Sequence, residues 1–390
     1  MAAEALARRG IDVTVHELHR SMGRKLLLAG RSGLNLTKAE PIDELLRRYE
    51  PSAPALERAV RDHGPEWLRS WADDLGAATF VGSSRRVFPE AMRAAPLLRA
   101  WLLRLDGLGV RFRPGHRWCG WSDDGALRFE ATGADGVRLT DVEADATVLA
   151  LGGASWPRVG SDGSWRAILE ARGVAVEPLT AANCGVLVPW SDVFLERFEG
   201  EPVKNVTVSV AGETHRGEIV ITRQGLEGGP IYAASRAVRR ELGRTGPCRI
   251  RLDLAPDLPL ARLGDRLEPR RPKETETRHL RRAGLAPVAI GLVREATANR
   301  LPGSPGEMAA LVKRAPIEIA ALAPIERAIS TAGGVSFAAI DDDFMLRDVP
   351  GVFVAGEMLD WDAPTGGYLL QACFATGAAA GVGASRRLAD

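Results

Sequence analysis

Three short, largely apolar segments spread over the whole chain constrain its fold more than any other feature. They are predicted to be strands, at residues 11–15, 146–151 and 352–355. Apolar runs of this length are typical of buried parallel strands. The second runs into Gly152 and Gly153 and the third into Gly356 and Glu357, and a glycine there lets a ligand approach the backbone. Strands at the start, middle and end of one chain predict a single sheet that is assembled discontinuously.

The start of the chain resembles the later part of a nucleotide-binding unit. A helix is predicted over residues 2–9, Gly10 caps it, and Glu17 stands where the following strand ends. In a dinucleotide fold an acid at this place accepts the ribose hydroxyls, about 20 residues after a glycine-rich turn. Counting back places that turn before Met1, so we expect the natural protein to carry roughly 15 to 20 more residues. The alternative is that Glu17 is a solvated residue after a strand.

The segments between the strands are predicted to be insertions. Residues 184–255 carry short alternating stretches and glycine turns, which predict a β-rich, barrel-like domain. Residues 256–324 have a helical pattern, and their charged start at 268–284 lacks the interleaved aromatic residues of a nucleic-acid site. Residues 1–183 and 325–390 are then predicted to form the nucleotide-binding domain.

Composition excludes several classes of protein. With 390 residues the chain is long enough for two or three domains of roughly 150 residues. Its 51 basic and 50 acidic residues give a net charge of +1, which disfavours nucleic-acid and anionic-lipid partners. The sequence has no run of about 18 uncharged apolar residues, so no membrane span is predicted. The cysteines and histidines lack ligand spacing, so we expect no metal site, and the four distant cysteines favour a reducing, cytoplasmic compartment.

The last sixty residues carry the strongest chemical signal. Thr365, Gly366, Gly367 and Tyr368 form a turn before a predicted helix of small residues, 369–381. A helix N-terminus preceded by glycines presents free N–H groups, which suit a phosphate or an electron-rich ring edge. The alternative is that the glycines only make turns and the helix only packs.

Several segments together resemble the YhiN/BaiN-type FAD-dependent oxidoreductases, also called aminoacetone-oxidase-like flavoproteins. They are GRKLLLAGRSGLNLT (23–37), RVFP (86–89), LALGGASWPRVGSDGSW (149–165), GEIVIT (217–222) with the glycines after it, TAGGV (331–335), PGVFVAGEMLD (350–360) and TGGYLLQACFATG (365–377). These similarities run in order from Met1 to Gly381, so they cover essentially the whole chain.

The resemblance implies an α/β fold, with a discontinuous Rossmann-type FAD-binding domain interrupted by β-rich and helical substrate domains. It also implies which residues bind each part of FAD: Glu17 the adenosine ribose; Arg24, Lys25 and Asn35 the pyrophosphate and flavin; Gly152 and Gly153 the adenine side; Gly356 and Glu357 the ribityl and phosphate groups; and Thr365, Gly366, Gly367, Tyr368 and Leu369 the turn at the isoalloxazine ring. The alternatives are that Arg24 and Lys25 are solvated cations and that Glu357 is a satisfied turn carboxylate.

The sequence departs from this family in three places. The first strand and its G-x-G-x-x-G turn are missing, so we expect the chain as written to fold or bind FAD poorly. Gly33 and Leu34 stand where the family has an Arg–Cys pair, and Ala363 and Pro364 replace a Gly–Tyr pair beside the flavin turn. A divergent subfamily is predicted.

The implied activity is that of an FAD-dependent oxidoreductase, with hydride transfer between flavin and a small organic substrate. The direction stays open between oxidation of an amine-like compound and reduction fed by NAD(P)H. Flavin chemistry needs few catalytic side chains, and Tyr368 is the candidate, as a flavin-face residue or proton donor, with core packing as its alternative role. The competing hypothesis is a non-catalytic or degenerate flavin-binding module, possibly tRNA-linked.

Overall fold

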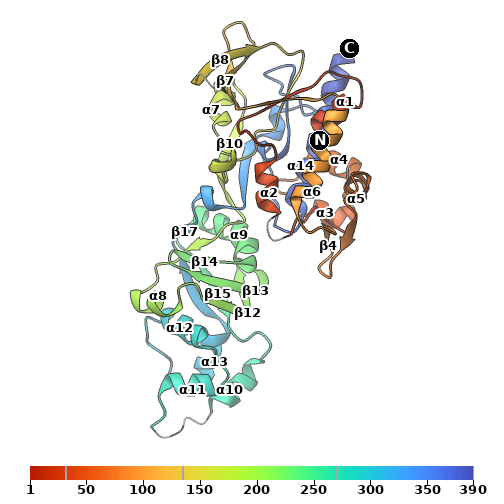
Figure 1. Cartoon of the computed structure of the whole chain (residues 1–390). Coiled ribbons are helices and arrows are strands. Elements are labelled where there is room, and N and C mark those ends of the chain that lie inside the picture. The colour runs from red at the N-terminus through yellow and green to blue at the C-terminus, as the bar shows by residue number, and fades with distance from the viewer. Residues whose placement is uncertain (31–32, 134–135, 269–270, 272, 390) are drawn as a thin grey trace. The chain divides into compact units, whose positions relative to one another are not determined.

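The computed structural model describes residues 1–30, 33–133, 136–268, 271 and 273–389. The chain divides into two units, one made of residues 1–180 and 330–390 and the other of residues 181–329 (Figure 1). The first unit is therefore discontinuous in sequence, as the spacing of the apolar strands predicts.

The first unit contains two pairs of parallel strands. The strand β1 (Thr14–Glu17) pairs with β5 (Arg111–Pro114), and β9 (Thr147–Leu149) pairs with β19 (Val352–Val354). The second pair joins two segments that the sequence predicted to be neighbours in one sheet. Among the described residues, however, the two pairs form separate two-stranded sheets, because no strand of one pair is hydrogen-bonded to a strand of the other. The prediction of a single continuous sheet is wrong to that extent.

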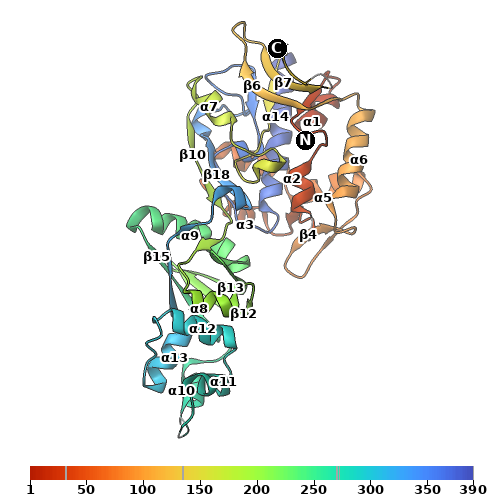
Figure 2. The same ribbon diagram turned by 60° about the vertical axis from the view of Figure 1, so that its left-hand side comes forward.

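The predicted bounds of two elements need correction. The first strand starts at Thr14 rather than at residue 11, because its ladder with β5 begins there and Gly10 turns the chain with a φ of 75°. The C-terminal helix α14 spans Tyr368–Ala389 and does not stop at Gly381. A Cβ atom on Gly381 would lie 2.7 Å from the carbonyl oxygen of Ala2, so this glycine lets the helix α1 (Ala2–Ala7) pack closely against α14 (Figure 2).

The first unit also contains a further set of helices and strands. They are α2 (Arg24–Ala29), β2 (Thr37–Lys38), α3 (Ile42–Leu46), α4 (Pro54–Asp62), α5 (Pro65–Asp74), β3 (Thr79–Val81), β4 (Arg86–Pro89), α6 (Ala94–Gly107), β6 (His116–Trp121), β7 (Leu127–Gly133), β8 (Gly136–Val142), η1 (Pro157–Val159), α7 (Trp165–Glu170), β10 (Val176–Ala182), β18 (Ser330–Val335), η3 (Phe337–Ala339) and η4 (Gly356–Met358). The largest apolar core of the chain includes Trp165, Phe353 and Trp361, each at most 2% exposed.

The second unit is built on a seven-stranded sheet in the order β16-β15-β12-β13-β14-β11-β17. Its elements are β11 (Val186–Leu187), α8 (Asp192–Phe198), β12 (Pro202–Val210), β13 (Glu213–Thr222), β14 (Gly225–Glu227), α9 (Gly229–Thr245), β15 (Cys248–Asp253), α10 (Leu260–Leu267), α11 (Glu276–Arg282), α12 (Pro287–Glu295), α13 (Pro305–Lys313), β16 (Ala315–Ile319), β17 (Ala321–Leu322) and η2 (Ile325–Arg327).

This sheet is open in the described part of the chain, with β16 and β17 at its edges, and not barrel-like. Both edge strands come from the segment that was predicted to be helical. The remainder of that segment is helical and has an apolar core of its own, which includes Leu263, Leu280 and Val293. Residues 269, 270 and 272 of its charged start lie outside the described residues.

None of the described helices combines the length and the apolar character that crossing a membrane requires. Within the same residues, no group of three or more His, Cys, Asp or Glu side chains is placed to hold a metal ion.

A histidine on β1 makes the stability of the first unit depend on pH. Burial, followed by the nearby His116 and Arg113, lowers the pKa of His16 to about 4, and its ring stacks on Phe129. The unfolded chain binds this proton near pH 6.5, so stability falls as the pH drops from about 6.5 to 4. Because the ring is about half exposed, we expect a loss of about 1 kcal/mol.

The variant His16→Phe keeps a ring at this place and removes the proton. Urea unfolding at pH 7 and pH 4.5 should show a smaller difference in unfolding free energy than in the wild type. An unchanged difference would show that His16 does not titrate in this range.

Candidate cofactor site

Lys25 and Glu357 form the centre of the candidate site. Lys25 stands in the first turn of α2, which begins after Gly23 in a left-handed conformation with a φ of 67°. The Lys25 Nζ atom donates hydrogen bonds to Glu357 Oε2 at 2.5 Å, to Ser155 Oγ at 2.9 Å and to Ser161 Oγ at 3.1 Å. The side chains of Lys25 and Glu357 are only 30% and 13% exposed. This ammonium group is therefore held in place rather than solvated.

Glu357 also accepts hydrogen bonds from two backbone N–H groups of other segments. Its Oε2 atom accepts from the N–H of Gly153 at 3.2 Å, and its Oε1 atom accepts from the N–H of Thr331 at 2.9 Å. A Cβ atom on Gly153 would overlap the Thr331 side chain. One carboxylate thus ties together the segments that follow β9 and β19 and the start of β18.

Two of the glycines that were predicted to bind the cofactor lie beside this carboxylate. Gly152 and Gly356 have φ values of 74° and 71°, which glycine adopts without strain. The N–H of Gly356 donates to Thr376 Oγ1 on α14 at 3.0 Å. Cys373, also on α14, has its pKa raised to about 12 by burial and by the nearby Glu357, so its thiol stays protonated at neutral pH.

A second cluster surrounds the glycine turn before α14. Gly366 and Gly367 have φ values of 124° and 104°, and a Cβ atom on Gly367 would lie 2.5 Å from the carbonyl group of Thr37. This close approach places β2 against the first turn of α14. There Lys38 Nζ donates to the Tyr368 hydroxyl at 2.9 Å, and the Tyr49 hydroxyl donates to the Tyr368 carbonyl oxygen at 2.9 Å.

Tyr368 is buried in an ionic environment. It is 3% exposed, and burial together with a hydrogen bond to Glu40 raises the pKa of its hydroxyl well above the ordinary value. Lys38 Nζ lies 3.5 Å from Glu40 Oε2. Lys38 and Glu40 were not among the residues selected from the sequence. They follow the Asn35-x-Thr37 loop and stand two positions apart, which puts both side chains on one face of an extended segment.

Three buried polar atoms between residues 19 and 40 have no hydrogen-bond partner in the described part of the chain. These atoms show whether a cofactor would fit here. They are His19 Nε2, Asn35 Oδ1 and Glu40 Oε1; a fourth such atom, Trp118 Nε1, lies on β6. A buried polar group without a partner costs about 1–3 kcal/mol. Three of them between residues 19 and 40 fit a polar ligand such as a dinucleotide that supplies the partners.

The remaining predicted residues differ in their exposure and in their contacts. Glu17 folds back on its own loop, where its Oε1 atom accepts from the N–H of His19 at 2.9 Å. Arg24 is exposed, and Thr365 and Leu369 are half-buried. Arg31 and Ser32 of the predicted loop lie outside the described residues.

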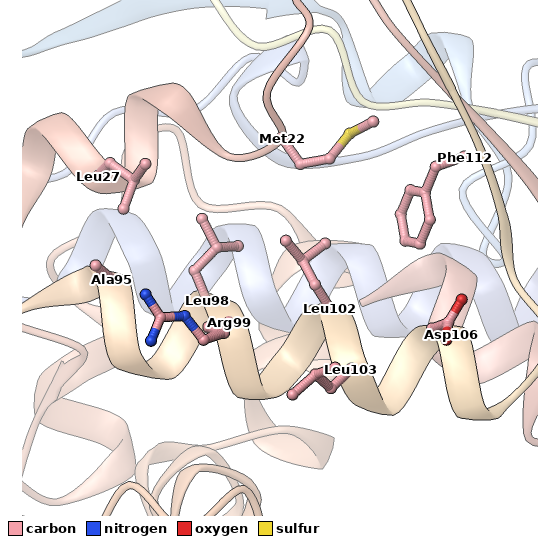
Figure 3. A pocket seen from close by; sticks show the side chains of 9 residues that line it. All are labelled: Met22, Leu27, Ala95, Leu98, Arg99, Leu102, Leu103, Asp106 and Phe112. Atoms are coloured by element: carbon pink, nitrogen blue, oxygen red, sulfur yellow. The ribbon is translucent and has the colours of Figure 1, made fainter.

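An apolar groove of about 540 Å³ lies elsewhere on the first unit, along α6. In Figure 3, Leu98 and Leu102 point from α6 toward Met22 and Leu27. None of the predicted cofactor residues lines this groove, so it is separate from the candidate site.

Comparisons with known proteins support the predicted family. The model of the HI0933-like protein Rossmann domain matches residues 1–383. The chain is 27% identical to a 3-dehydro-bile acid delta(4,6)-reductase from Clostridium scindens, over 99% of this chain and 96% of that protein.

Solved structures with a similar course of the chain include two steroid dehydrogenases. One is a 3-ketosteroid-delta4-(5alpha)-dehydrogenase from Rhodococcus jostii RHA1, with a TM-score of 0.49, 15% identity, and coverage of 99% of this chain and 94% of that one. The other is a 3-ketosteroid delta1-dehydrogenase from Sterolibacterium denitrificans, with a TM-score of 0.47, 14% identity, and coverage of 99% and 97%.

The expected Rossmann-type fold and flavoprotein family agree with the family match, which covers nearly the whole chain. The sequence motifs, the parallel strand pairs and the glycine-lined cluster of Lys25 and Glu357 all fall within the matched residues. The chain therefore belongs to the HI0933-like Rossmann-domain family.

Proposed function

We propose that the protein is an FAD-dependent oxidoreductase that transfers a hydride between flavin and a small organic substrate. One observation carries the proposal: in a chain that matches this family over residues 1–383, Glu357 joins the segments after β9 and β19 to Lys25 and the start of β18. Ligands of open α/β sheets bind at the carboxyl ends of the strands. The cluster lies at two such ends.

The residues of this cluster suit the groups of FAD. Lys25, paired with Glu357, holds Ser155 and Ser161 in place, and the glycines at 152, 153 and 356 allow the backbone to approach the pyrophosphate. The unpartnered atoms of His19 and Asn35 supply further hydrogen bonds. When bound, the flavin itself accepts or gives the hydride.

The protein would then contribute orientation and a proton. The raised pKa of Tyr368 keeps its hydroxyl protonated at neutral pH, while Lys38 donates to its oxygen. We propose that Tyr368 is the proton donor and that Lys38 and Glu40 hold its hydroxyl in position. The bile-acid relative is named a reductase, which favours reduction fed by NAD(P)H as the direction.

Organisation and location form part of the same proposal. Residues 1–183 and 325–390 form the FAD-binding domain, and residues 184–324 form the inserted part, in which β16 and β17 complete the β-rich sheet and the rest of 256–324 is helical. The substrate is a small organic molecule, and the four free cysteines favour a cytoplasmic location.

Tyr368→Phe tests the catalytic part of this proposal. Loss of a general acid costs about 10²–10⁴-fold in rate, so transfer from reduced flavin to substrate should slow by at least about 100-fold. Flavin reduction by NAD(P)H should keep its rate, because it needs no proton from this residue. Stopped-flow absorption measures the two half-reactions separately.

Tyr232→Phe is the matched control, because Tyr232 belongs to the other unit and bonds Glu227 there. It should leave both half-reactions unchanged. Equal rates in Tyr368→Phe and the wild type would assign Tyr368 to core packing.

A further inference from the structure

Trp156 holds a backbone conformation that its side chain disfavours. Its φ and ψ are 62° and 59°, in the left-handed region, and Pro157 follows it. An L-residue in this region costs about 1–2 kcal/mol, and a bulky residue there is an outlier. Glycines occupy the other left-handed positions of this loop, at 152, 160 and 163. Only Trp156 carries the strain.

The Trp156 side chain is more exposed than that of the nearby Trp165. It is 38% exposed, whereas Trp165, nine positions later, is 2% exposed. Among the described residues, the Trp156 indole makes no hydrogen bond and no ring contact, while Trp165 Nε1 donates to the carbonyl oxygen of Gly152. Strain of this kind persists where the surroundings enforce it, and it gathers at ligand sites.

The candidate cofactor site is what fixes this loop. Ser155 and Ser161, on either side of Trp156, both accept hydrogen bonds from Lys25 Nζ. Gly160 lies against the His19 ring, where a Cβ atom would be 3.4 Å from the unpartnered Nε2. The loop thus places Trp156 between two serines that Lys25 holds, within the cluster that we assign to the cofactor.

We propose that Trp156 is a stacking residue, which lays its indole on a flat ring of the bound dinucleotide, either the adenine or the isoalloxazine. Stacking of an aromatic side chain on a nucleic-acid base is worth about 1–3 kcal/mol, which is enough to offset the backbone strain. The assignment rests on the proposed FAD site but not on the direction of the reaction or the substrate.

The variant Trp156→Gly separates the effect of the backbone strain on stability from the effect of the indole on FAD binding. Because glycine relieves the left-handed strain, the melting temperature without ligand should rise by about 2 °C. The Kd for FAD should rise about tenfold, which corresponds to about 1.4 kcal/mol. Calorimetry measures the melting temperature, and flavin fluorescence titration measures the Kd for FAD. Trp156→Phe should restore most of the affinity.

Arg85→Gly is the matched control. Arg85 is exposed and also left-handed, with a φ of 61°, in the turn between β3 and β4. Its replacement should raise the melting temperature similarly and leave the Kd for FAD unchanged.

Two fragments of the cofactor identify the stacked ring. A weaker ADP affinity in Trp156→Gly with unchanged riboflavin affinity assigns adenine, and the reverse pattern assigns isoalloxazine. Equal FAD affinity in Trp156→Gly and the wild type overturns the stacking contact alone. A wild-type protein without FAD affinity overturns the proposed function and the contact with it.

Discussion

Glu357→Ala should destabilise the first unit by about 3–5 kcal/mol and abolish retention of FAD. The carboxylate accepts from Lys25 Nζ and from the N–H groups of Gly153 and Thr331. Its removal leaves three partly buried donors without their acceptor, and each unsatisfied buried group costs about 1–3 kcal/mol. Urea unfolding followed by circular dichroism measures the stability, and flavin absorbance after gel filtration measures retention.

A surface carboxylate provides the control for this prediction. Asp342 pairs with Arg58, but its side chain is 87% exposed. Asp342→Ala should therefore change the unfolding free energy by less than about 1 kcal/mol and keep the flavin. Similar small effects in both variants, with the flavin retained, would show that Glu357 is only a satisfied N-cap or turn carboxylate.

Gly367→Ala should cost about 3 kcal/mol or more. Its φ of 104° is unfavourable for alanine, and the new Cβ atom would lie 2.5 Å from the carbonyl carbon and oxygen of Thr37. Backbone strain adds about 1–3 kcal/mol, and β2 must move away from α14 to relieve the overlap. Thermal unfolding should show a large drop in melting temperature.

A glycine in open surroundings gives the opposite expectation. Gly264 lies within α10, and a Cβ atom there would meet nothing within 4 Å. Gly264→Ala should stabilise the protein by about 0.5–1 kcal/mol. If Gly367→Ala were equally benign, the close approach of β2 to α14 would be absent in solution.

Local pattern was sufficient to predict the strands and the glycine turns beside them. The apolar runs at 146–151 and 352–355 contain β9 and β19, which pair in parallel, because buried parallel strands need short uncharged segments. Lys25 and Glu357 were both selected from the resemblance, and the structure brings them into contact. Their pairing with each other was not foreseen, since nothing local links residues so far apart in sequence.

The rest depends on long-range contacts that one sequence does not specify. The left-handed Trp156 lies between Ser155 and Ser161, which both accept hydrogen bonds from the distant Lys25, and no local signal predicts this arrangement. Glycine normally ends a helix, yet α14 continues through Gly381 because α1 packs on that side. The edge strands β16 and β17 have partners that stand many residues earlier in the chain.

The most direct test of an FAD-dependent oxidoreductase is the visible absorption spectrum of the purified protein, before and after anaerobic addition of NADH or NADPH. We predict the two absorption bands of bound oxidised flavin, with loss of the longer-wavelength band on reduction and its return when an oxidising substrate is added. A protein that shows no flavin bands, even after incubation with FAD and removal of the excess, would contradict both the cofactor and the proposed activity.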